Sequence, residues 1–216
     1  MAWNVHGFRA GTPRVAEVIA EQGPDVAFLN EAGYLGFRVH RLARRVGMGV
    51  AAGGGLRHRI PNAVLIRPPW RVVDQRIEVL PRSGSELRRG AVVATIGRAG
   101  RRLVAVAVHL GLSERERARH AEVLTDLLTG RHEPVILGGD LNESPDGPAA
   151  SWIGERYWDA FANLAEGDGL TFPSADPRAR IDYLFVSSGL EIERAWVAGQ
   201  PDASDHLAVL ADVRTG

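Results

Sequence analysis

The stretch Pro134-Val-Ile-Leu-Gly-Gly-Asp-Leu-Asn142 constrains the fold most, because an apolar run of strand length stops at two glycines and then presents a carboxylate and an amide. Residues i and i+2 of an extended segment share a face, so Asp140 and Asn142 are predicted to point the same way, with Leu141 in the core. The alternative interpretation is a strand that ends in an Asx turn. Other apolar runs also end in polar residues, which are Asn4, Glu31 and His109.

Hydrophobic periodicity predicts strands alternating with helices in each half of the chain. A Thr12 N-cap followed by Pro13 predicts one helix, and a capping box of Ser113 and Glu116 predicts another. The expected strands are 2–5, 25–31, 63–66, 72–79, 91–96, 103–109, the run that ends at Asp140, 180–186, 191–197 and 207–213. Together these elements predict a four-layer α/β sandwich, in which two mixed β-sheets pack face to face with helices on the outside. We expect residues 1–216 to form a single domain.

Composition excludes several classes of chemistry. The 26 basic and 26 acidic residues cancel, so any polyanion binding must be local. All basic residues are arginines, which excludes Schiff-base and Walker-type chemistry, and the absence of cysteine excludes thiol nucleophiles and thiolate metal sites. No signal peptide or membrane helix is recognisable, and we expect a cytoplasmic monomer without membrane insertion.

Several carboxylates, amides and imidazoles are expected at strand ends, where an α/β sheet protein gathers them at one crevice. The set comprises Asn4, Glu31, His109, Asp140, Asn142, Asp182, Asp205 and His206. Packed carboxylates repel one another, and a divalent cation with oxygen ligands removes that repulsion. The other histidines, His6, His40, His58, His120 and His132, are interpreted as surface or helix residues.

Six segments occur in the order Trp-Asn4-Val, Phe-Leu-Asn-Glu31, Val-His109-Leu, Gly-Gly-Asp140-Leu-Asn142, Arg-Ile-Asp182-Tyr and Ser-Asp205-His206. In this order they resemble the endonuclease/exonuclease/phosphatase superfamily of metal-dependent phosphoesterases, over nearly the whole chain. That superfamily includes deoxyribonuclease I-like nucleases, abasic-site endonucleases, sphingomyelinases and inositol polyphosphate 5-phosphatases. Its fold is the four-layer sandwich that the periodicity predicts.

The resemblance implies a role for each matched residue. Asn4, Glu31 and Asp205 would surround Mg²⁺ or Mn²⁺, and Asp140 would deprotonate the attacking water with help from Asn142. His206, held by Asp182, would stabilise the transition state, and His109 would help to protonate the leaving oxygen. Asn30 replaces the family's usual glutamine, and Glu78 and Glu86 are the candidates for an acid that pairs with His109.

Arginines in expected loops are candidates for the substrate cleft, because guanidinium groups bind phosphate oxygens in pairs. They are Arg57, Arg59, Arg88, Arg89, Arg101, Arg102, Arg178 and Arg180, of which the last two are preferred. The expected function is hydrolysis of phosphodiester bonds in DNA or RNA. The alternatives are a phosphoesterase for a small molecule or lipid headgroup, such as a sphingomyelinase or phosphomonoesterase, and a non-catalytic binding module with the same fold.

Overall fold

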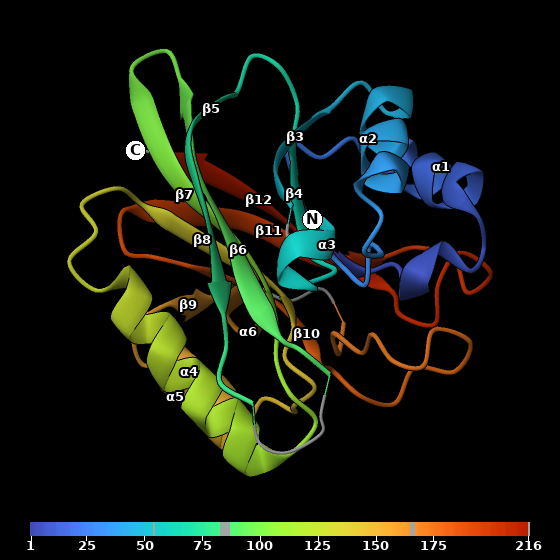
Figure 1. Ribbon diagram of the computed structural model, residues 1–216. Coiled ribbons are helices and arrows are strands. Elements are labelled where there is room, and N and C mark those ends of the chain that lie inside the picture. The colour runs from blue at the N-terminus through green and yellow to red at the C-terminus, as the bar shows by residue number, and fades with distance from the viewer. Residues whose placement is uncertain (54, 83–86, 165–166, 216) are drawn as a thin grey trace.

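The computed structural model describes residues 1–53, 55–82, 87–164 and 167–215, and it confirms the predicted sandwich of two mixed sheets (Figure 1). One sheet has the strand order β11-β12-β1-β2-β4-β3 and the other the order β5-β6-β7-β8-β10-β9. The strands of the first sheet are β1 Ala2–Asn4, β2 Val26–Asn30, β3 Gly49–Gly53, β4 Ala63–Ile66, β11 Leu190–Ala198 and β12 Ala208–Thr215. Those of the second sheet are β5 Arg71–Val79, β6 Gly90–Arg98, β7 Arg101–His109, β8 Val135–Asp140, β9 Trp158–Asp159 and β10 Asp182–Val186.

Helices cover the outer faces of both sheets (Figure 1). The helices that do so are α1 Thr12–Gln22 and α2 Gly36–Arg45 on the first sheet, and α4 Glu114–Leu128 and α5 Pro148–Gly154 on the second. The described residues also form the 3₁₀ turn η1 His6–Phe8 and the short helices α3 Gly55–His58 and α6 Ala160–Leu164. In the described part of the chain, no helix combines the length and apolar character needed to cross a membrane.

Three hydrophobic clusters separate the four layers. The first joins α1 and α2 to one face of the first sheet, and the third joins α4 and α5 to the outer face of the second sheet. The middle cluster lies between the sheets and includes Phe28 from β2 and Leu184 from β10. Successive strand residues therefore serve different layers, since Leu29 packs under α1 and α2 while Phe28 faces the other sheet.

Two predicted helix starts differ in detail from the structure. Thr12 is the first residue of α1 and Gly11 is its N-cap, so the predicted Thr12 cap is wrong. At α4 the Ser113 hydroxyl accepts a hydrogen bond from the Glu116 amide, which confirms half of the capping box. The Glu116 carboxylate does not complete it, because both of its oxygens are buried without a hydrogen-bond partner.

The strand ends meet in register at one rim of the sandwich. Asn4 pairs with Asn30 across the parallel strands β1 and β2. Asp140 pairs with His109 across the parallel strands β7 and β8, and with Asp182 on the antiparallel strand β10. Side chains alternate along a strand, so each of these strand-end residues points to the same face as the residue two positions before or after it. Asn30, for example, shares with Phe28 the face that lies between the two sheets. Five polar side chains from five strands thus point into the rim between the sheets.

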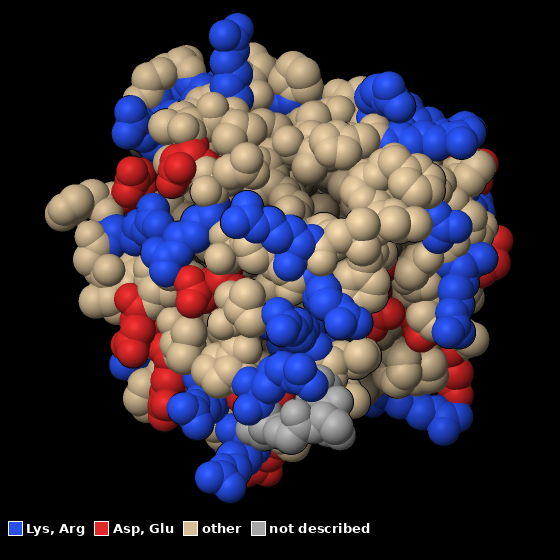
Figure 2. Space-filling view, viewed as in Figure 1, with Lys and Arg blue, Asp and Glu red and all other residues tan. Residues whose placement is uncertain are grey.

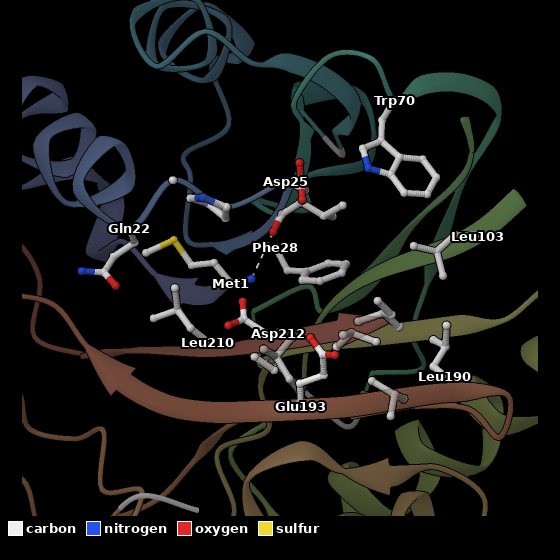
Figure 3. Close-up of a pocket in the computed structure, with 18 of the residues that line it drawn as sticks. Met1, Gln22, Asp25, Phe28, Trp70, Leu103, Leu190, Glu193, Leu210 and Asp212 are labelled. Atoms are coloured by element: carbon white, nitrogen blue, oxygen red, sulfur yellow. Dashed lines mark hydrogen bonds between the residues drawn. The ribbon is translucent and has the colours of Figure 1, made fainter. Parts of the chain in front are cut away.

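A cavity of about 400 Å³ lies at the opposite rim, where β2, β7 and β8 begin (Figure 3). Its walls include the apolar residues Phe28, Leu103 and Leu190 and the acids Asp25 and Asp212. None of the predicted site residues lines it. The candidate site therefore has to be built from the side chains at the other rim.

Candidate active site

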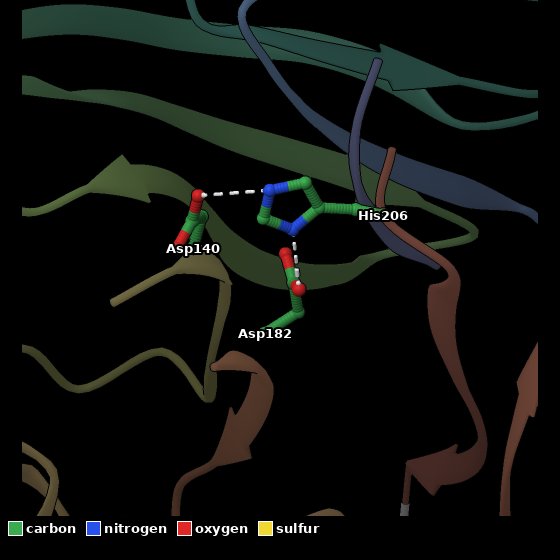
Figure 4. Close-up of side chains that lie close together, drawn as sticks. All are labelled: Asp140, Asp182 and His206. Atoms are coloured by element: carbon green, nitrogen blue, oxygen red, sulfur yellow. Dashed lines mark hydrogen bonds and ion pairs between the residues drawn. The ribbon is translucent and has the colours of Figure 1, made fainter. Parts of the chain in front are cut away.

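Asp140 is the hub of the candidate site. Its Oδ2 atom accepts a hydrogen bond of 3.0 Å from Asn4 Nδ2 and lies 3.3 Å from Nε2 of His109. The same oxygen lies 3.9 Å from Nε2 of His206. Side chains from both sheets and from the segment before β12 therefore converge on one buried carboxylate oxygen. Figure 4 shows His206 on one side of it.

Asn142 is placed by a turn and not by strand alternation. Strand β8 ends at Asp140, and Asn142 has a left-handed backbone with φ of 51°. Its amide N–H donates to Asp140 Oδ1 at 2.8 Å, and its side chain donates to the Leu110 carbonyl at 3.1 Å. The predicted shared strand face is therefore wrong, and the alternative of an Asx turn is the observed geometry.

Asn30 connects the two sheets directly beneath Asp140. Its Nδ2 donates to the Val108 carbonyl at 2.8 Å, and its Oδ1 accepts from the Asp140 amide at 2.9 Å. The side chain is fully buried. Gly139 leaves room for this bridge, because a Cβ there would lie 1.9 Å from the Val108 oxygen and 2.9 Å from Asn30 Oδ1. Asn30, which in the sequence stands out only as a replacement for the family's usual glutamine, thus positions the backbone of Asp140.

His206 lies between two aspartates, and its ring bridges Asp140 and Asp182 (Figure 4). Its Nδ1 is 2.8 Å from Asp182 Oδ2, while its backbone carbonyl accepts from the Trp3 indole at 2.9 Å. Burial alone lowers the pKa of His206, but the charge and hydrogen bond of Asp182, with the charges of Asp140 and Asp205, outweigh it and raise the pKa to about 9. His206 is therefore an imidazolium at neutral pH.

His109 has the opposite electrostatics. Burial is the main reason that its pKa is lowered to about 3; Asp140 opposes this effect and Arg89 adds to it. Arg89 Nη1 lies 2.9 Å from Nδ1 and 2.8 Å from Nε2 of the ring. Because arginine can only donate, the arrangement is satisfied when Arg89 donates to Nδ1 and the Nε2–H of neutral His109 faces Asp140. Arg89 is thus a partner of the His109 ring in addition to Asp140. Of the two candidate acids, Glu78 pairs with Arg76, and Glu86 lies outside the described residues.

The predicted metal ligands lie around the end of β1. Asn4 Oδ1 accepts from the His6 amide at 3.0 Å, and the Asn4 carbonyl accepts from the Ser204 hydroxyl at 2.7 Å. Ser204 is followed by Asp205, whose Oδ1 lies 3.2 Å from His6 Nδ1. His6 lies in the 3₁₀ turn η1, which agrees with its interpretation as a surface or helix residue, and it also contacts a predicted metal ligand. His120 lies in α4, which agrees with that interpretation, and its side chain is fully buried.

Glu31 follows the end of β2 in a strained backbone conformation. Its φ is 51°, and its carbonyl accepts from the Gly7 amide at 2.9 Å. A non-glycine residue in this region is uncommon and is a reason to examine a site for function. Among the described residues, none hydrogen-bonds or forms an ion pair with the half-buried Glu31 carboxylate.

The oxygen donors at this rim fit a hard divalent cation. Within the described part of the chain, the Glu31 carboxylate has no hydrogen-bond or ion-pair partner, and Asp182 Oδ1 is buried without a hydrogen-bond partner. Atoms of Asp140, Asp182 and His206 also lie within 4.8 Å of one another, a grouping that can hold a metal ion. In that grouping Nδ1 of His206 is already bonded to Asp182, whereas the carboxylate of Glu31 has no competing partner. Carboxylate and amide oxygens are the ligands that Mg²⁺ and Mn²⁺ prefer.

The two arginines preferred for substrate binding have partners of their own. Arg180 is buried, forms an ion pair with Asp159 and lies over the rings of Phe161 and Tyr183. Arg178 is exposed and forms an ion pair with Asp176 two residues away. The structure gives Arg180 a packing role and brings neither guanidinium into a hydrogen bond with the catalytic candidates.

A model of the Endonuclease/Exonuclease/phosphatase family matches residues 1–206. The fold is similar to that of the endonuclease/exonuclease/phosphatase from Bacteroides vulgatus, with a TM-score of 0.85 and 19% identity over 100% of this chain and 97% of that chain. It is also similar to D. rerio TDP2 complexed with single strand DNA product, with a TM-score of 0.82 and 18% identity over 99% and 97% of the two chains. A mannosyl-6-phosphatase from Bacteroides thetaiotaomicron gives a TM-score of 0.84 and 16% identity over 99% and 98%. No curated protein matches the chain.

Proposed function

Because the chain belongs to the Endonuclease/Exonuclease/phosphatase family, whose members are divalent-metal-dependent phosphoester hydrolases, we propose that it hydrolyses phosphodiester bonds in nucleic acid by in-line attack of water. The observation that supports the proposal most is a continuous series of contacts, in which Asn4 hydrogen-bonds to Asp140, Asp140 lies at ion-pair distance from His206, and His206 hydrogen-bonds to Asp182. It places a carboxylate next to an imidazolium within one buried rim. A base and a cationic donor are the two groups that a phosphoester hydrolase needs beside its metal.

Asp140 is the proposed general base. It takes a proton from the attacking water as the new oxygen–phosphorus bond forms and the bond to the leaving oxygen breaks. The Asn142 amide and the Asn4 side chain hold the two carboxylate oxygens, so their orientation is fixed before substrate arrives. The proposal also assigns to the Asn142 side chain the holding of the water or a phosphate oxygen.

His206 is the proposed cationic partner. As an imidazolium it donates a hydrogen bond to a phosphate oxygen, meets the negative charge that develops there and supplies a proton to the leaving oxygen. Asp140, 3.9 Å away, then returns its proton to His206, so the cycle is balanced. In this proposal His109, whose pKa burial lowers to about 3, has the role of a neutral hydrogen-bond donor toward Asp140.

The proposed metal ligands are Glu31, Asn4 and Asp205, and the proposed ion is Mg²⁺ or Mn²⁺. When bound, this ion supplies positive charge to the phosphate and lowers the pKa of a coordinated water. The unpartnered Glu31 carboxylate supports this choice, because a carboxylate near a protein interior needs a cation or a hydrogen-bond donor.

A second candidate function is hydrolysis of a small-molecule or lipid-headgroup phosphoester. The formal net charge of zero favours it, because nucleases usually show a basic groove. The likeness to a mannosyl-6-phosphatase also supports it.

A substrate panel with Mg²⁺ and Mn²⁺ tests the proposal and separates it from the alternatives. It compares plasmid, oligonucleotide and abasic-site DNA with RNA, sphingomyelin and sugar phosphates. Nucleic-acid cleavage that disappears in EDTA is the expected result, and Asp140→Ala and His206→Ala should each reduce it at least a thousandfold in protein that remains folded by circular dichroism. Cleavage confined to sphingomyelin or phosphomonoesters would support the second candidate. Full activity in both variants would rule out the mechanism.

A further inference from the structure

Arg57, Arg59 and Arg88 are exposed cations on two segments beside the catalytic rim. In the part of the chain that the structure describes, no carboxylate forms an ion pair with any of the three. Many other arginines do have such partners, including Arg14, Arg76, Arg117, Arg156, Arg178, Arg180 and Arg214. With no ion pair to a described carboxylate, the three guanidinium groups are available to an external anion.

The two segments that carry these arginines are packed together at the rim. The Asn62 side chain donates to the Gly90 carbonyl at 2.9 Å, and Gly90 leaves space for the Ile60 side chain, which lies 2.1 Å from where a Cβ would be. The stretch from α3 to β4 is thus fixed against the start of β6. Figure 2 shows arginine side chains gathered over α3 and continuing toward the segment ahead of β6.

Both segments connect directly to the candidate active site. The Pro61 carbonyl accepts from the Ala32 amide at 2.6 Å, so the α3 side adjoins Glu31. On the β6 side, Arg88 is followed by Arg89, which contacts the His109 ring. The arginines therefore lie on two segments, one adjoining the proposed metal ligand Glu31 and the other leading to the residue that contacts His109.

Each segment also exposes a leucine next to its arginines. Leu56 is 64% exposed and Leu87 is 65% exposed, although both are large apolar side chains. A polynucleotide presents a series of phosphates separated by sugars and bases, so it offers both anions and apolar surface along one line. A single lipid headgroup or sugar phosphate offers one anion and leaves the other arginines without a partner.

We propose that Arg57, Arg59 and Arg88 form a track that binds the phosphates flanking the scissile bond of a polynucleotide, with Leu56 and Leu87 in contact with its sugars or bases. This inference rests on the proposed nuclease function and names the surface by which that function would hold a long substrate. It replaces Arg178 and Arg180 as the expected substrate-binding arginines. It also explains how a chain with a formal net charge of zero can bind a polyanion, because the charge is local.

The test compares two triple variants that remove equal charge. The track variant is Arg57→Gln, Arg59→Gln and Arg88→Gln, and the control variant replaces Arg41, Arg44 and Arg45, which are exposed on α2, with glutamine. Fluorescence anisotropy measures binding of a labelled 20-nucleotide strand and of its duplex, in EDTA and over a series of NaCl concentrations. Arg89 is left in place because it contacts His109.

The track variant should bind the oligonucleotide at least tenfold more weakly. The slope of log K against log[NaCl] should become shallower by about 2 to 3, since each lost phosphate contact contributes about 0.7 to 0.9. The control variant should stay within about threefold of the wild type, because nonspecific loss of charge is screened at moderate salt. The single-strand and duplex arms identify which form the track prefers. Equal losses in the two triple variants would overturn the proposal, as would wild-type binding to anionic phosphatidylserine vesicles without binding to either oligonucleotide.

Cleavage assays keep this inference separate from the proposed function. If the wild type cleaves oligonucleotides and the track variant binds and cleaves them equally well, the track is refuted while the nuclease function stands. If the wild type binds oligonucleotides through the track but cleaves none of them, the nuclease function fails while the track stands. Support for both requires that the track variant lose at least tenfold more activity on a 20-nucleotide strand than on bis(p-nitrophenyl) phosphate.

Discussion

The substitution Asp182→Asn isolates the electrostatic partner of His206. Asparagine retains an oxygen that can accept from Nδ1 of the ring at the 2.8 Å position, but it removes the negative charge. That charge and hydrogen bond are the main reasons that the pKa of His206 reaches about 9 despite burial, which by itself lowers it. In the variant, burial should dominate, and the pKa of His206 should fall below 7.

The magnitude follows from the difference between the ordinary histidine pKa of 6.5 and the value of about 9. At about 1.4 kcal/mol per tenfold change in proton affinity, this difference corresponds to about 3 kcal/mol of stabilisation of the folded protein. Because the folded-state pKa is raised, this stabilisation is fully present below pH 6.5 and is lost as the pH rises through about 9. The difference in unfolding free energy between wild type and Asp182→Asn should therefore be largest near pH 6 and should shrink toward pH 10.

NMR titration of the His206 ring in EDTA measures the pKa directly, and urea unfolding at pH 6 and pH 10 measures the stability difference. Asp205→Asn is the matched control: it makes the same chemical change at a half-exposed carboxylate that contributes least among the acids raising the pKa of His206. The control should lower that pKa by much less. A pKa near 9 in Asp182→Asn, or equal decreases in the two variants, would refute the electrostatic reasoning.

Three further predictions concern the residues around the hub. Asn30→Ala removes two buried hydrogen bonds and should lower the unfolding free energy by about 2 to 5 kcal/mol. The control Asn62→Ala removes one buried hydrogen bond and should lower it by about 1 to 2 kcal/mol. Equal losses of the two variants in urea unfolding would contradict the bridging role of Asn30. Gly139→Ala places a Cβ 1.9 Å from a backbone oxygen of β7 at φ of 151°, so it should destabilise the protein by about 3 kcal/mol, and an unchanged melting temperature would contradict this close packing. Arg89→Met removes a positive charge that lowers the pKa of His109, so that pKa should rise above about 3 in an NMR titration. An unchanged pKa would show that the charge of Arg89 does not act on His109.

Local patterns in the sequence were sufficient for the layers and for most element positions. The hydrophobic pattern of a strand is set by its own residues and ends at a flanking glycine, proline or polar residue. The strands β2, β4 and β8 were therefore recognisable without knowing which strands pair with them. The order of six short motifs predicted the family, and the family model that matches residues 1–206 confirms it. Period-two alternation also explains why Asn30 and Asp182 share the inner faces. These features require only sequence neighbours a few residues apart.

The pairing of individual side chains was decided by the tertiary structure. Arg180 and Asp159 are 21 residues apart, and His109 and Arg89 are 20 apart, so their contacts depend on which strands pair and in which register. The placement of Asn142 depended on a positive φ that brings its amide to Asp140, which a strand pattern does not reveal. Sequence thus determined which groups stand at the ends of the strands. The packing of two sheets determined which of those groups share hydrogen bonds and charge, because such contacts are made between segments whose separation along the chain carries no information about their distance in space.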